Sequence, residues 1–322
     1  QNDTLTDSED AYDDVPMITI TASELESDQP SQDLSGLLQA SRDIFVSRAA
    51  YIFSNARFRM RGYDSKNTRV LINNLPMNNM ESGRAYWSNW GGLNDAVRNK
   101  VIVNGLNPTD YGFGGVGGLT NISTLASKYR PQTKLSISAA NKSYRNRVML
   151  THSSGMSDKG WAYTISGSRR WAEEGIVEGT FYDAWSYFLS LDKKINTKHT
   201  VLLTGFGSSN RRGKSGVGTQ EAYDLTDNNY YNPYWGYQQG EKRNARVSNY
   251  HKPKIILNHF WDINDDQKLT SGVQYTFGRG GSTALNWYDA ADPRPDYYKY
   301  LPSYWEDDAN WYNFYTEQWQ NN

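Results

Sequence analysis

From Pro131 to Phe277, apolar and polar side chains alternate with a period of two residues. One set is aliphatic or aromatic, and the positions between its members are mostly Ser, Thr, Gly, Gln or charged. Members of the apolar set include Leu135, Ile137, Val148, Leu150, Trp161, Tyr163, Ile165, Trp185, Tyr187, Leu189, Leu203, Ile255, Leu257, Val273 and Tyr275. This period is typical of strands with two unlike faces, so it predicts an antiparallel sheet.

The connections between these strands alternate in length. Short polar turns are expected at 155–159, 193–198 and 264–268, and longer excursions at 170–182, 210–252 and from 279 onward. Short turns at one end and long loops at the other are the arrangement of an outer-membrane β-barrel.

The segment before the sheet has a different pattern. Residues 32–40 predict a short helix, and 44–46, 57–61, 69–75, 101–103 and 119–124 predict short strands, with a helical turn at 94–100. Residues 30–130 therefore form a small α+β unit with many loops.

The first 41 residues contain ten acidic residues and no Lys or Arg. Residues 1–14 have almost no apolar side chains, and such a composition predicts a disordered tail. The β-prone stretch 15–21 interrupts the acids, and Pro16 restricts it to an edge strand because proline has no N–H to donate.

Composition narrows the class of protein. The chain has no Cys, 14% aromatic residues and a mean hydropathy of −0.79. No apolar run approaches the roughly 20 residues that a membrane helix needs. A membrane barrel with a polar lumen fits these values, and a secreted glycan-binding β protein fits them equally.

No catalytic, cofactor or metal site is indicated. The glycine-rich run 111–118 lacks the Gly-Lys-Ser/Thr of a phosphate loop, and it predicts a tight turn packed against another segment. The four His residues have no paired metal-binding spacing. A net charge of −1 gives no reason to expect a nucleic-acid partner.

Three blocks resemble the plug of TonB-dependent receptors. Residues 58–78 read FRMRGYDSKNTRVLINNLPMN, close to the family's Arg-Gly strand end followed by V-L-I-N-G-x-P, with Asn74 in place of the usual Gly. VIVNGLNP at 101–108, YG at 111–112 and GGLTNIST at 117–124 resemble the second plug block. DLSGLL at 33–38 resembles the opening helix.

The resemblance implies a fold and three regions. An α+β plug domain would be followed by antiparallel transmembrane β-barrel strands, and the full barrel of the family has 22 strands. We expect a flexible acidic segment at 1–29, a plug at 30–130, and roughly the first seven barrel strands with long extracellular loops at 131–322. On this interpretation the chain is the N-terminal portion of a longer outer-membrane polypeptide, whose signal peptide has been removed before Gln1.

The resemblance also implies active import of a scarce nutrient, of the siderophore, glycan, peptide or cobalamin class. The partners would be TonB with its inner-membrane proton-driven motor, outer-membrane lipids and a small or oligomeric substrate. A surface lipoprotein lid is less expected, because the Tyr-Val-Val-Asp-Gly stretch of receptors with such a lid is replaced here by Val70-Leu71-Ile72-Asn73-Asn74. An outer-surface adhesin or glycan-binding β protein without transport is the alternative.

Site residues follow from the same resemblance. A periplasmic TonB box is expected at Asp14, Val15, Pro16, Met17, Ile18 and Thr19, and a plug–barrel lock at Arg59 and Arg61. Substrate contacts are expected in the plug's apical loop at 77–89 and in two aromatic loop clusters, at 230–237 and 287–305. The predicted contact residues are Asn78, Asn79, Glu81, Arg84, Tyr86, Trp87, Tyr231, Trp235, Trp287 and Tyr288.

Overall fold

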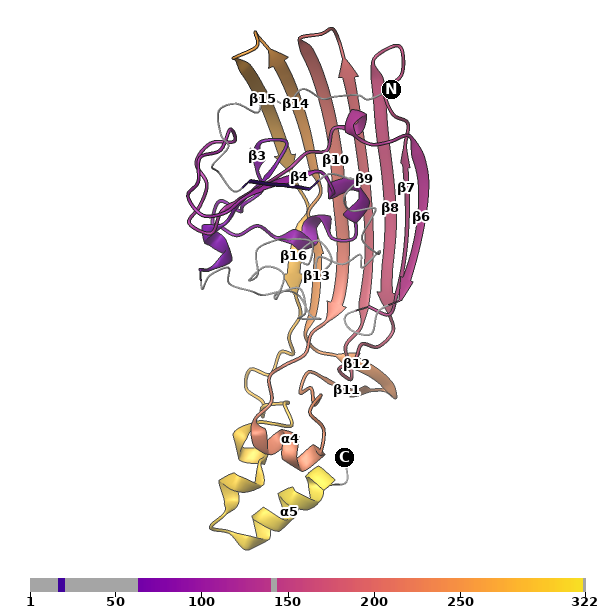
Figure 1. The fold of residues 1–322 in the computed structure, drawn as a ribbon. Helices are drawn as coiled ribbons and strands as arrows, with labels where there is room; N and C mark the ends of the chain where they lie inside the picture. Colours follow the sequence, from indigo (N-terminus) through magenta and orange to yellow (C-terminus); the bar gives the residue numbers. More distant parts are fainter. Residues whose placement is uncertain (1–16, 21–62, 140–143, 321–322) are drawn as a thin grey trace.

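A computed structural model describes residues 17–20, 63–139 and 144–320. The expected helix at 32–40, the strands at 44–46 and 57–61, and Arg59 and Arg61 lie outside these residues. The described chain forms a small N-terminal sheet that lies against one face of a large antiparallel sheet (Figure 1).

The small sheet has the strand order β1-β4-β5-β2-β3. Its strands are β1 (Met17–Ile20), β2 (Arg69–Ile72), β3 (Leu75–Pro76), β4 (Lys100–Val103) and β5 (Leu119–Ile122). β2 and β5 are parallel, and the other pairs are antiparallel. Four 3-10 helices lie in its connections: η1 (Ser65–Asn67), η2 (Trp87–Trp90), η3 (Asn94–Val97) and η4 (Ala126–Lys128).

The single strand expected at 69–75 is wrong in detail, because the chain turns within it. Asn73 and Asn74 have φ of 50° and 69°, and β2 folds back onto β3 through them. Asn is one of the few residues besides Gly that adopts this left-handed conformation at low cost. The segment therefore forms a tight hairpin that ends against the large sheet.

The glycine-rich run packs as the sequence predicts. The N–H of Gly117 donates to the Asn67 carbonyl over 3.0 Å. A Cβ on Gly118, whose φ is +97°, would lie 2.5 Å from the Val103 carbonyl oxygen. Only glycine allows these two backbones to approach so closely.

The large sheet runs in the order β15-β14-β10-β9-β8-β7-β6. Its strands are β6 (Gln132–Ala139), β7 (Asn146–Ser153), β8 (Trp161–Ala172), β9 (Tyr182–Lys194), β10 (His199–Gly213), β14 (Lys254–Asp262) and β15 (Lys268–Thr276). β13 (Val247–His251) and β16 (Arg279–Ser282) extend it beside the end of β10. The period-2 pattern thus gave the expected antiparallel strands.

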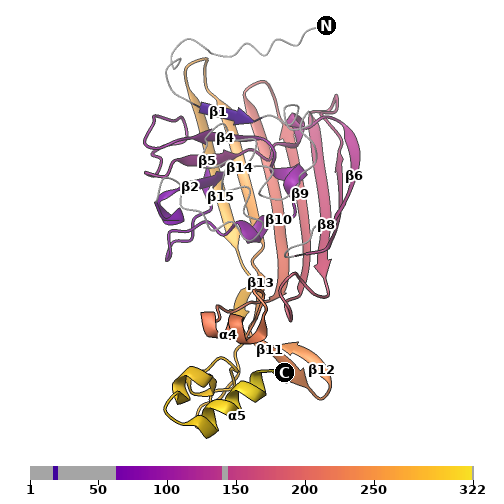
Figure 2. The same cartoon turned by 60° about the horizontal axis from the view of Figure 1, so that its bottom comes forward.

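The loops divide the sheet into two ends. Short turns join β7 to β8, β9 to β10 and β14 to β15 at the first end, which we call the short-turn end. At the long-loop end lie the hairpin of β11 (Trp235–Gln238) and β12 (Glu241–Asn244) and the helices α4 (Gln220–Thr226) and α5 (Ala309–Gln320) (Figure 2). The short 3-10 helices η5 (Tyr298–Tyr300) and η6 (Pro302–Trp305) precede α5.

Neither α helix was expected from the sequence. α4 begins after Thr219, whose side chain accepts a hydrogen bond from the Ala222 N–H, and α5 begins after Asp308, which caps it in the same way. Both caps are visible in the sequence. The aromatic content of α5 (ANWYNFYTEQWQ) favours strand over helix and obscures the signal.

Candidate functional site

The apical loop of the plug, residues 77–89, and the segment 90–92 that follows it lie on the long-loop side of the small sheet. Asn73 and Thr124, at the strand ends, reach Thr204 in the middle of β10. Farther along, the Gly91 carbonyl accepts a hydrogen bond of 2.6 Å from Ser186, near the long-loop end of β9. The loop therefore faces the end of the sheet where the long loops gather.

The predicted amides in this loop are engaged within it. Asn78 accepts from the Val70 N–H at 2.9 Å and donates to the carbonyls of Thr68 and Gly83 at 2.9 and 2.8 Å. The side chain of Asn79 accepts from two backbone N–H groups, those of Glu81 and Ser82. These two amides hold the loop in shape, so their contribution to a binding surface is to position its neighbours.

Three other predicted residues project from the loop. Glu81, Arg84 and Tyr86 are exposed. Arg84 pairs with Asp64 over 2.7 Å, and the pKa of Asp64 is lowered by the Lys66 N–H that it accepts and by Arg84. The Tyr86 hydroxyl lies 3.2 Å from that of Ser82, and the Tyr86 side chain is 47% exposed. This set offers one cation, one anion and one ring to a ligand.

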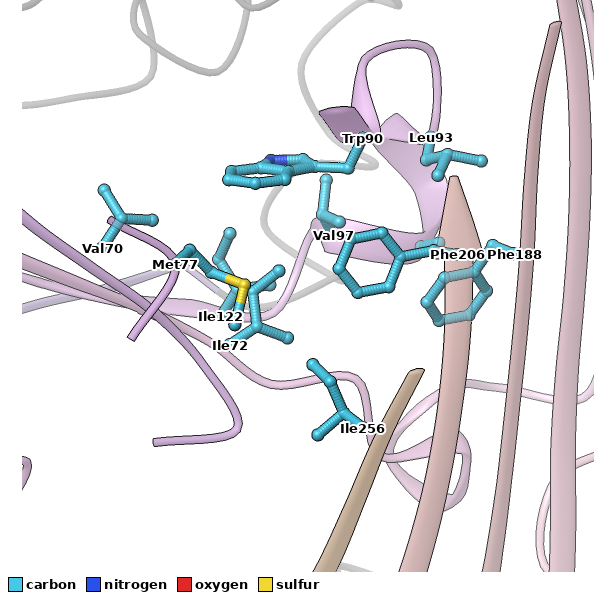
Figure 3. Close-up of a cluster of buried hydrophobic side chains, with 11 residues drawn as sticks. Val70, Ile72, Met77, Trp90, Leu93, Val97, Ile122, Phe188, Phe206 and Ile256 are labelled. Atoms are coloured by element: carbon cyan, nitrogen blue, oxygen red, sulfur yellow. The ribbon is translucent and has the colours of Figure 1, made fainter. Parts of the chain in front are cut away.

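Trp87 points the other way. Its ring packs edge-on to Trp90, with centroids 5.4 Å apart, beside a buried apolar cluster. That cluster joins the plug to the large sheet (Figure 3). Its members are Val70, Ile72, Met77, Trp90, Leu93, Ala96, Val97 and Ile122 from the plug and Phe188, Phe206 and Ile256 from the sheet.

A polar network lies beside the cluster. Asn73 donates to Thr124 over 2.7 Å and accepts from the Thr124 N–H, and the Thr124 hydroxyl lies 2.9 Å from Thr204 of β10. Asn258 of β14 donates to the Asn73 carbonyl, and Ser190 of β9 donates to that of Thr124. Sequence reasoning did not assign these contacts, and the only signal for them was the row of small polar residues on one face of each strand.

Two predicted loop aromatics pack against other loop residues. Tyr231 lies beside Tyr223 and Trp319, and burial raises the pKa of its phenol. Trp235 rests on Gly179, where a Cβ would overlap its ring, and it carries the Lys242 ammonium 4.5 Å from its centroid. These contacts hold the long loops together, as the packed side chains of compact surface loops do.

Trp287 and Tyr288 differ from that pair. Trp287 is 44% exposed and Tyr288 is 89% exposed. They lie in the segment between β16 and η5, and they offer open ring faces to a ligand. Trp287 and Tyr288 are therefore more exposed than Tyr231 and Trp235.

The predicted TonB box is described only in part. Met17, Ile18 and Thr19 lie in β1, which pairs antiparallel with β4 from Met17↔Val103 to Ile20↔Lys100. β1 is the outermost strand of the small sheet, so its second edge carries no strand among the described residues. Asp14, Val15 and Pro16 lie outside the described residues.

In the described part of the chain, no three His, Asp or Glu side chains are grouped so that they could hold a metal ion. Among the same residues, no helix is long and apolar enough to span a membrane.

The comparisons with known proteins agree on the class. Residues 13–119 match the model of the TonB-dependent receptor plug domain, and this part of the chain is a plug domain of that family. With the large sheet beside it, the chain has the fold of a TonB-dependent receptor in which part of the barrel follows the plug. A comparison with curated protein sequences gives no match.

Three solved structures illustrate the shared fold. The siderophore receptor PirA from Pseudomonas aeruginosa is 16% identical, with a TM-score of 0.52 over 83% of this chain and 41% of that one. The ferripyoverdine receptor of the Pseudomonas aeruginosa outer membrane is 8% identical, with a TM-score of 0.52 over 83% and 34%. The alcaligin receptor FauA from Bordetella pertussis is 13% identical, with a TM-score of 0.51 over 84% and 40%. The chain spans less than half the length of each, and identities this low show the fold alone.

Proposed function

We propose that the chain is part of an importer that takes up a scarce nutrient across the bacterial outer membrane, driven by TonB, with the plug gating the barrel. The main support for this proposal is the packing of the plug against the large sheet. Its apolar cluster and its Asn73–Thr124 network occupy the inner face of the large sheet, where a channel would otherwise run. A surface adhesin has no need of a domain that fills the lumen.

The outer face of the sheet supports a lipid environment. Leu135, Ile137, Ile165, Leu257 and Val273 are all half or more exposed on it, although they are aliphatic. Such a surface is unstable in water and matches the apolar band of a membrane barrel. We place the short-turn end toward the periplasm and the long loops outside.

For the substrate, we propose the siderophore class first among those the family takes up. Support comes from three proteins of similar fold, which are siderophore, ferripyoverdine and alcaligin receptors. The proposed contact surface consists of Glu81, Arg84 and Tyr86 on the plug and Trp287 and Tyr288 on the loops, with Asn78, Asn79, Trp87, Tyr231 and Trp235 as supports. Arg59 and Arg61 remain the proposed lock to acidic residues of the wall.

For coupling to TonB, we propose β1 together with Asp14–Pro16. Strand addition needs an extended segment with an unpaired edge, and among the described residues the outer edge of β1 pairs with no other strand. TonB would then either pair with that edge or separate the four residues of β1 from β4.

Deletion of residues 13–20 tests the proposal. We expect energised uptake of iron-loaded siderophore by whole cells to be lost, while binding to de-energised cells and the amount of receptor in the membrane stay unchanged. A deletion of residues 2–9, in the acidic segment before the box, is the matched control and should transport normally. Uptake that survives the first deletion places the coupling strand elsewhere. Binding without energised uptake in the intact protein favours the adhesin.

A further inference from the structure

Two buried arginines lie side by side on the inner face of the large sheet. Arg147 of β7 and Arg170 of β8 are directly opposite in the strand register and are 2% and 7% exposed. Residues paired in this way have Cβ atoms about 5 Å apart. Arg212, on the next inward row of β10, adds a third positive charge toward the long-loop end.

Arg170 is held in place without a carboxylate. Its guanidinium lies 5.5 Å from the centroid of Tyr182 and 5.9 Å from that of Tyr144, and one N–H reaches Ser208 at the long distance of 3.5 Å. Its Nε has no hydrogen-bond partner, and within the described residues no acidic side chain comes within ion-pair distance of it. Burying an incompletely paired charge is costly, so such residues inside a membrane protein mark ligand or ion pathways by default.

The plug covers this guanidinium with bare backbone. A Cβ on Gly91 would lie 3.2 Å from Arg170 Nη2, and one on Gly92 would lie 2.8 Å from its Nε and 2.7 Å from the Ser168 hydroxyl. Gly92 also has φ of +85°, which favours glycine. Among the described residues, a hydrogen bond from Ser186 to the Gly91 carbonyl holds the segment over the site.

We propose that Arg170 is an anion site on the inner wall that Gly91 and Gly92 occlude until the plug moves. It rests on the proposed importer function and deepens it, because the transported molecule then carries oxyanion groups such as carboxylates. The planar guanidinium fork matches such groups, and the two tyrosine faces orient it. The ligand replaces the glycine backbone when the plug withdraws.

Ion selectivity in planar bilayers tests the site directly. The purified receptor is inserted, its plug is loosened with urea, and the reversal potential is measured in a KCl gradient. We expect the open pore to prefer chloride over potassium, and citrate added on the long-loop side to block the current. Arg170→Gln should lower the chloride preference and raise the half-blocking citrate concentration at least about tenfold, the loss expected for one charged hydrogen-bonding partner.

Arg169→Gln is the matched control, because it removes the same charge from the residue that precedes Arg170 in β8. The Arg169 guanidinium stacks on Trp185 of the outer face and so lies away from the proposed site. It should behave as wild type, and Arg170→Lys should retain most of the chloride preference. If Arg170→Gln does not fold, Gly92→Ala replaces it and should give a chloride-selective leak without urea. A wild-type pore without anion preference, or one that Arg170→Gln leaves unchanged, overturns the site. Since TonB is absent from this measurement, its outcome is independent of whether energised uptake occurs.

Discussion

The two faces of strands β8 and β9 differ in the opposite sense from those of a soluble protein. Their apolar side chains are exposed, and their polar side chains are mostly buried. On β8 the exposed positions are Trp161, Tyr163 and Ile165, and the buried positions between them are Ala162, Thr164 and Ser166. β9 repeats the arrangement, with Trp185, Tyr187 and Leu189 exposed and small polar residues mostly buried. The polar face is buried because the plug covers it, and the apolar face requires lipid.

The inner face is not uniformly polar, and the difference is informative. Phe188, Phe206 and Ile256 interrupt the small residues exactly where the plug's apolar cluster meets the wall. Elsewhere, Ser and Asn side chains of the wall donate hydrogen bonds to the plug backbone. A contact made mainly of short hydrogen-bonding side chains can be exchanged for water at modest cost, which suits a plug that must move.

Phe206→Ala should have the largest effect. The ring is 2% exposed and packs edge-on to Trp90 with centroids 6.2 Å apart, so its loss leaves a cavity between plug and wall. We expect the plug's free energy of unfolding to fall by about 3–5 kcal/mol, measured by urea titration with protease sensitivity of the plug as the signal. Leu203→Ala, on the outer face of the same strand, should cost much less because lipid fills its space. Equal losses would mean that the two faces do not differ in packing.

Ile165→Arg tests the outer face. Ile165 lies near the middle of the apolar band on β8. Toward the short-turn end it is preceded by Trp161 and Tyr163, and toward the long-loop end it is followed by Arg169 and Trp171. An arginine there should destabilise the barrel by about 2–4 kcal/mol in lipid vesicles, whereas Trp161→Arg at the rim should cost about 0–1 kcal/mol. The heat-modifiable fraction on gels reports the outcome, and a depth-independent effect would refute the lipid-facing assignment.

The sequence predicted these two faces but could not say where each one points. Period-2 alternation identifies two unlike faces, and only the plug-like blocks at 58–78 and 101–124 indicated that the polar one faces inward. Trp87 shows the same limit, because its position in a polar loop suggested a ligand contact, and the fold turns it onto Trp90. Local pattern fixes which side chains share a face, whereas the partner of that face depends on contacts distant in sequence.

Lys100 tests whether water is excluded from the interior of the plug. It begins β4, is 9% exposed, and burial lowers its pKa to about 8. Between about pH 8 and its ordinary pKa of 10.5, the unfolded plug binds a proton that the folded plug does not. The plug's stability should therefore rise with pH across that window, by up to about 3 kcal/mol.

Lys100→Met should remove this pH dependence and stabilise the plug at pH 7, where the wild-type lysine is buried with its charge. Urea titrations of both proteins at pH 7 and pH 10 measure the change. Exposed Lys66→Met is the control and should leave the slope intact. A wild-type plug with flat stability across the window would mean that water reaches Lys100.

Asn74→Gly should have the smallest effect on the plug's free energy of unfolding. It distinguishes what the backbone conformation of the turn requires from what the side-chain contact with the wall contributes. Its φ of 69° suits glycine, and its amide makes a hydrogen bond of 3.4 Å to Thr270 on the wall and one of 2.6 Å from Asn121 in the plug. Asn74 is only half-buried, so water can replace these partners, and we expect a loss of about 1 kcal/mol or less.

Asn73→Gly keeps the same freedom at φ of 50° but removes a 3% exposed amide from the network with Thr124 and Thr204, and it should cost about 2–3 kcal/mol. Equal effects in urea titrations of the plug would show that the turn conformation, and not the contact with the wall, is what both residues supply.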